Sequence, residues 1–143
     1  MTKRLFFIFF AALAMSISAF SQSAPTAMDK PARLVMQVSD NDPARWNLVM
    51  NNAQNVQKNL GASHVEIEIV AYGPGVKMLT LDSTANSRVA EVVKSGIKVV
   101  ACENTMHGMN LTKADMNPAI GFVPAGAVEI MQKQLQGWAY IRP

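Results

Sequence analysis

The residue with the clearest chemical potential is Cys102, the only cysteine in a chain of 143 residues. It follows an apolar run over residues 97–101, and Asn104 and Thr105 after it are residue types that often begin helices. This order predicts a buried strand, a thiol at its carboxyl end, and a helix start. Open α/β sheets bind ligands beyond the carboxyl ends of their strands, and N–H groups at a helix start favour the thiolate. Cys102 is therefore the candidate catalytic nucleophile, with Glu103, Asn104 and Thr105 as candidate supporting residues.

The two histidines give Cys102 no evident general base. His107 lies five positions further on, on a different face of a helix, and His64 begins another strand, at the opposite end of a parallel sheet. A hydrolytic dyad needs contact between cysteine and histidine, whereas sulfur exchange needs only a thiolate and no metal or organic cofactor. Two alternatives stay open. In the first, Cys102 is a buried, inert residue. In the second, Glu103 points inward and opposes formation of the thiolate.

A second hypothesis rests on soft ligands near the same position. The sulfur and imidazole groups that cluster here belong to Cys102, Met106, His107, Met109 and Met116. Thiolate and thioether ligands select Cu(I), although methionine also fills irregular gaps in hydrophobic cores. The alternative function is thus a non-catalytic, oligomeric binding module for a soft metal such as Cu(I) or for a small ligand.

The first residues have the pattern of a secretory signal peptide. Lys3 and Arg4 precede an apolar run over residues 5–20, and small residues follow, so we expect cleavage after Ser21 or Ser23 and a periplasmic protein. The run is short for a membrane span, which leaves an uncleaved anchor as the alternative. The whole chain has 13 basic and 10 acidic side chains. Without the two leader cations the signs nearly balance, which indicates neither a nucleic-acid partner nor a membrane surface after cleavage.

We expect a signal peptide over residues 1–23, a linker over 24–32 and one domain over 33–143. Apolar runs predict strands at 34–38, 65–71, 97–102, 121–124 and 138–141, with helices at 43–60, from Ser83 or Thr84 to 95, in part of 104–116, and at 125–136. This alternation predicts a single α/β domain in three α/β/α layers, with a mainly parallel sheet of about five strands.

Details of burial follow from the same patterns. The first helix is expected to turn one face inward, made of Trp46, Val49, Met50, Ala53, Val56 and Leu60. Alternation over residues 65–71, with Val65, Ile67 and Ile69 on one side and Glu66, Glu68 and Val70 on the other, indicates a half-buried strand near a sheet edge. Residues 72–75 form a turn, and the last helix is expected to bury Val128, Met131 and Leu135.

Three segments resemble the DsrE/DsrF-like family, which includes small sulfur-relay proteins of sulfur oxidation and tRNA thiolation. They are VVACENTM around Cys102, EIVAYGPGVKML from Glu68 to Leu79, and FVPAGAVEIMQKQLQGWAYIRP at the end of the chain. The resemblance spans Leu34 to Pro143. It implies an α/β/α sandwich, a homo-oligomer or family hetero-oligomer, and a Cys102 that carries sulfur as a persulfide. It therefore implies a sulfur carrier or sulfurtransferase that exchanges sulfur with a donor or acceptor protein or with a small thiol.

Overall fold

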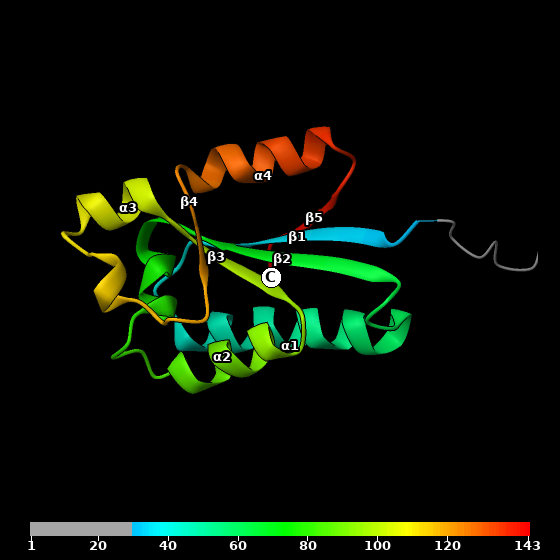
Figure 1. Ribbon diagram of the computed structural model, residues 1–143, viewed down its shortest axis with the longest axis horizontal. Helices are drawn as coiled ribbons and strands as arrows, with labels where there is room; N and C mark the ends of the chain where they lie inside the picture. The colour runs from blue at the N-terminus through cyan, green and yellow to red at the C-terminus, as the bar shows by residue number, and fades with distance from the viewer. Residues whose placement is uncertain (1–29) are drawn as a thin grey trace, which may run out of the picture.

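The computed structural model describes residues 30–143, which form a three-layer α/β/α domain (Figure 1). Five parallel strands pair in the order β4-β3-β2-β1-β5. Helices α1 (Pro43–Leu60) and α2 (Asn86–Lys94) cover one face of the sheet, and α4 (Gly126–Leu135) lies on the other. The fold class expected from the sequence is confirmed. The expected signal peptide and most of the expected linker lie outside the described residues.

The first strand and helix match their sequence patterns closely. β1 (Ala32–Val38) is buried along most of its length and pairs on both sides, as expected of a continuous apolar run. The side chain of Asp42 accepts a hydrogen bond from the Ala44 N–H and caps α1, whose first residue is Pro43. The expected inward face of α1 is buried up to Ala53, but Leu60 is exposed.

The expected edge position of residues 65–71 is wrong. β2 (Val65–Ala71) lies in the middle of the sheet between β1 and β3 (Lys98–Cys102), and all its residues except Glu66 are buried. The misleading signal is Glu68, which has the alternating polar position of a half-buried strand yet is 0% exposed. Its charge is balanced by two lysines from other parts of the chain, which the local pattern does not reveal.

The segment after β2 is a 3-10 helix, η1 (Gly73–Leu79), instead of a simple turn. It packs directly on the carboxyl end of β1. A Cβ atom on Gly75 would lie 2.4 Å from the backbone oxygen of Val38, a distance that no side chain tolerates. The glycine therefore allows two backbone segments to touch and fixes where the loop after β2 begins.

Residues 103–123 form three short elements. They are helix α3 (Glu103–Gly108), the 3-10 turn η2 (Lys113–Asp115) and strand β4 (Gly121–Val123). Figure 1 places α3 beyond the carboxyl end of β3. The partial helix expected at this position is confirmed.

The expected inward face of the last helix is wrong. Val128, Met131 and Leu135 are 44%, 53% and 80% exposed, whereas Ile130 is buried against Val70 and Val100 in the smaller of the two hydrophobic clusters. The larger cluster lies between the sheet and the helices α1 and α2. Helix α4 thus carries its main apolar stripe on the outside of the single chain.

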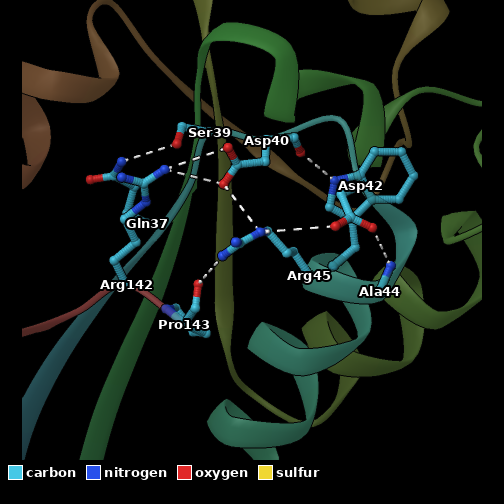
Figure 2. A network of polar contacts seen from close by, with 9 residues as sticks. Gln37, Ser39, Asp40, Asp42, Ala44, Arg45, Arg142 and Pro143 are labelled. Carbon is cyan, nitrogen blue, oxygen red and sulfur yellow. Dashed lines mark hydrogen bonds and ion pairs between the residues drawn. The ribbon is translucent and has the colours of Figure 1, made fainter.

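The last strand, β5 (Ala139–Ile141), pairs with β1 and brings the end of the chain to the start of α1. Figure 2 shows the polar network that holds it there. Arg142 donates to the carboxylate of Asp40 at 3.2 Å, and Arg45 donates to the backbone oxygen of Pro143 at 3.2 Å. Among residues 30–143, no helix is both long and apolar enough to cross a bilayer.

Candidate functional site

Cys102 lies where its sequence position predicts, at the carboxyl end of β3 and directly before α3. Its side chain is 4% exposed. Side chains alternate along a strand, so Cys102 shares the α4 side of the sheet with Val100, while Val99 and Ala101 face the larger core. The thiol is therefore held between the end of the sheet and the beginning of α4.

Three backbone segments meet at this position. The N–H of Gly73, at the start of η1, donates to the hydroxyl oxygen of Thr105 at 3.0 Å. The N–H of Asn104 donates to the backbone oxygen of Pro124, just before α4, at 3.1 Å. These bonds join the loop after β2, the start of α3 and the start of α4. Because the Thr105 oxygen accepts from Gly73, its hydroxyl proton is free to point at the sulfur of Cys102.

The surroundings favour the thiolate of Cys102. Burial alone raises the pKa of the thiol, but hydrogen bonds from the Thr105 hydroxyl and from the N–H groups of Gly126, Thr105 and Asn104 outweigh it, and the pKa falls below its usual value. The sulfur makes no regular capping hydrogen bond to α3, and among the groups that lower the pKa the Thr105 hydroxyl has the largest effect. The stabilisation comes from several donors at the starts of two helices.

Gly126 allows α4 to approach the thiol. A Cβ atom at this position would lie 2.9 Å from the Cβ of Tyr72 and 3.3 Å from the Cβ of Cys102. A contact of 2.9 Å is too short for any side chain, so only glycine lets the first N–H of α4 come this close. Sequence reasoning missed Gly126 and Gly73, although both lie in the segments that carry the family resemblance.

The supporting residues have separate roles. The hydroxyl and the N–H of Thr105 and the N–H of Asn104 all favour a lower pKa of the thiol. Glu103 instead forms an ion pair with Lys113 at 3.0 Å, and the ammonium group of Lys113 also lies 4.8 Å from the centre of the Phe122 ring. The carboxylate of Glu103 is thereby directed to Lys113, which removes the expected alternative in which it opposes the thiolate.

The soft ligands considered for copper do not share one environment. Met106 and Met116 are buried in the larger core, His107 is exposed, and Met109 is half-buried. Within residues 30–143, no three His, Cys, Asp or Glu side chains gather as a metal site. His64 is exposed before β2, at the opposite end of the sheet from Cys102. Cys102 thus has backbone donors and Thr105 around it, while Met106 and Met116 lie in the larger core.

Comparison with known proteins identifies the family of the chain. The model of the DsrE/DsrF-like family matches residues 32–143. No functionally curated protein matches the chain.

Several solved structures share the fold of this chain. MTH1491 from Methanobacterium thermoautotrophicum, a protein of unknown function, is 34% identical with a TM-score of 0.75, and the match covers 78% of this chain and 99% of that one. BT1422 from Bacteroides thetaiotaomicron is 20% identical with a TM-score of 0.64, covering 78% and 94%. The ychN protein of E. coli shares the fold at 10% identity, with a TM-score of 0.62 and coverage of 80% and 99%. The chain is a member of the DsrE/DsrF-like family.

Proposed function

We propose that this protein is an exported sulfur carrier in which Cys102 holds a sulfur atom as a persulfide and passes it to an acceptor thiol. The observation that carries the proposal is the environment of Cys102, a thiol at the end of a parallel strand whose pKa is lowered by donors from two helix starts. Family membership supports it as well. The absence of a histidine beside the thiol suits sulfur exchange, in which thiols are both attacking and leaving groups.

The proposed reaction balances without an oxidant. The Cys102 thiolate attacks the outer sulfur of a donor persulfide, a new S–S bond forms, and the donor leaves as a thiolate. In the second step an acceptor thiolate attacks the outer sulfur on Cys102, which breaks that S–S bond and regenerates the thiolate. The N–H groups of Gly126, Thr105 and Asn104 stabilise negative charge on Cys102 before loading and after transfer.

Partners are part of the same proposal. The exposed stripe of Val128, Met131 and Leu135 runs along α4, the helix whose first residue contacts Cys102. Exposed apolar surface of this kind favours association. We propose that a second copy, or a related family member, covers this stripe, and that a donor or acceptor protein or small thiol reaches Cys102 from the carboxyl edge of the sheet.

Sulfur loading is measured by intact mass after incubation with polysulfide, before and after treatment with a reductant. We expect a gain of one sulfur atom that the reductant removes. Because Cys102 is the only cysteine, the Cys102→Ser variant is expected to gain nothing. If the native protein neither gains sulfur nor reacts with a small alkylating agent, the carrier proposal is wrong. The alternative, a non-catalytic binding module, would then take its place.

A further inference from the structure

The thiol of Cys102 is almost enclosed, although sulfur transfer requires a second sulfur atom to reach it. Its side chain is 4% exposed. In an exchange step the sulfur of the donor or the acceptor must come into direct contact with the sulfur of the protein. One of the groups around the thiol therefore has to move before the reaction can take place.

Tyr72 is the neighbour of Cys102 on the adjacent strand. The last paired residues of β2 and β3 are Ala71 and Ala101. Tyr72 and Cys102 follow them directly, at the next position of two strands that lie about 4.8 Å apart. Tyr72 packs against the smaller hydrophobic cluster, so both side chains lie on the α4 side of the sheet. A Cβ atom on Gly126 would lie 3.3 Å from the Cβ of Cys102 and equally 3.3 Å from the Cδ1 ring atom of Tyr72. The ring therefore forms one wall of the site.

The other groups around the thiol are held in place. Val123 of β4 pairs with Cys102 on its other side and is 7% exposed. The hydroxyl oxygen of Thr105 accepts a hydrogen bond from the N–H of Gly73, and Gly126 has no side chain to move. Displacing any of these groups costs packing or a hydrogen bond.

Tyr72 combines a fixed backbone with a side chain that is free to turn. Its N–H donates to the backbone oxygen of Val38 at 3.0 Å, and its own backbone oxygen accepts from the N–H of Gly75 at 3.1 Å. The side chain is half-buried. Within residues 30–143 its hydroxyl has no hydrogen-bond partner, unlike that of Tyr140, which donates to Gln37. Rotation of the Tyr72 ring to another rotamer thus breaks no hydrogen bond.

We propose that Tyr72 is the specificity-determining residue of the sulfur site: its ring covers Cys102 at rest and turns away to admit a donor or an acceptor. The inference rests on the proposed sulfur transfer and adds which reagents can take part. Rotation of one ring leaves a narrow opening. The partner class is therefore a slender thiol or persulfide with little bulk beside its sulfur, and a cysteine held on a broad folded surface is excluded.

Alkylation with two reagents of different width tests the cover. Iodoacetamide and its fluorescein derivative carry the same reactive group, so the ratio of their rates at Cys102, the only cysteine, reports the width of the opening. An open form that makes up about 10% or less of the native protein slows the reaction by about tenfold or more. In Tyr72→Ala we expect the fluorescein reagent to gain that factor and iodoacetamide to gain a smaller one.

Three further variants separate the cover from general packing. Tyr72→Phe keeps the ring and should keep the native ratio of rates, because the hydroxyl has no partner. Tyr72→Val retains a branched side chain beside Gly126 and should match Tyr72→Ala, which keeps the test valid if the alanine variant folds poorly. Tyr140→Ala removes the same kind of ring from β5, which β1 and β2 separate from β3, and should leave the ratio unchanged.

The pH profile distinguishes an open cover from a displaced helix. Tyr72 is not among the groups that lower the pKa of Cys102, so the midpoint of the alkylation rate against pH should stay native in Tyr72→Ala. A native ratio of rates in both Tyr72→Ala and Tyr72→Val contradicts the proposal, as does an equal rise of both rates with a shifted midpoint. Sulfur loading from polysulfide is measured separately. Loading with an unchanged ratio retains the carrier and removes the cover, whereas a changed ratio without loading removes the carrier alone.

Discussion

Gly126 and Cys102 lie so close that a Cβ atom on the glycine would be 3.3 Å from the Cβ of the cysteine, and 2.9 Å from that of Tyr72. The first N–H of α4 thereby reaches the thiol and lowers its pKa. One position of the site is therefore a residue without a side chain, which belongs to a different helix from the one that Cys102 precedes.

Gly126→Ala is expected to push α4 away from the thiol. The unfolding free energy should fall by about 1–3 kcal/mol, as in other overpacked cores, and the pKa of Cys102 should rise because a donor is displaced. Urea denaturation and the pH dependence of alkylation measure the two effects. Gly108→Ala is the control, because no atom lies within 4 Å of a Cβ at that helical position, and it should leave the thiol unchanged. Equal behaviour of the two variants would contradict the packing argument.

Thr105 tests the hydroxyl contribution. In Thr105→Val the thiol loses a hydrogen bond and the N–H of Gly73 loses its acceptor. Because a lowered pKa extends thiolate reactivity to lower pH, the midpoint of the alkylation rate against pH should move up, toward the value of about 8.5 for a free cysteine. Thr105→Ser retains the hydroxyl and should keep the native profile. If Thr105→Val and Thr105→Ser give the same midpoint of the alkylation rate against pH, the hydroxyl does not act on the thiol.

Substitutions at Lys133 and Glu129 should change the unfolding free energy in opposite directions, although the two residues form an i,i+4 pair on α4. Lys133→Met leaves the buried Glu68 carboxylate with Lys98 alone, and the loss of a buried ion-pair partner typically costs about 3–5 kcal/mol. Burial and the nearby Glu68 carboxylate raise the pKa of Glu129, so Glu129→Gln should be neutral or stabilising at pH 7. Urea denaturation compares them. A double variant, Lys133→Met with Glu68→Gln, should recover much of the loss, and failure to do so would mean that charge is not the cause.

The exposed stripe of α4 should hold a partner copy. We expect Met131→Glu or Leu135→Glu to convert an oligomer into monomers in light scattering at micromolar concentration, because a charge is placed in an apolar contact. Gln134→Glu adds the same charge to an exposed position beside the stripe and should leave the mass of the oligomer in light scattering unchanged. A native protein that is monomeric at all these concentrations contradicts the proposal.

Export remains a prediction from the first residues of the sequence. Mass spectrometry of the protein isolated from its native cells should give an amino terminus between Gln22 and Ala24. An intact Met1 in the membrane fraction would instead indicate an anchor.

The sequence was sufficient for the order of elements and for the position of Cys102, because both depend on local patterns such as the Asp42–Pro43 helix start. It was not sufficient for Glu68, whose burial depends on lysines that approach from β3 and α4. Nor did the sequence predict that the side chain of Met131 is exposed. The rule that an apolar stripe faces the core holds for a chain whose apolar surface is all covered within one copy, and α4 does not satisfy that condition.

The contact between Gly126 and Cys102 was also beyond sequence patterns, since it depends on how closely two backbones approach. A glycine near the start of a helix does not by itself indicate a close contact between backbones. The contact is seen only in the structure, where Tyr72 and Cys102 lie beside Gly126.

The pairing of β5 with β1 also determines when folding can finish. Contacts across this pair, such as that between the Tyr140 hydroxyl and the side-chain oxygen of Gln37, join residues 103 positions apart. Contacts between residues so distant in the chain form slowly, because a large loop must close first. One side of β1 therefore stays unpaired until residues 139–141 reach it. Until then the chain exposes an unpaired strand edge, the kind of surface on which strands of other chains can pair and aggregate.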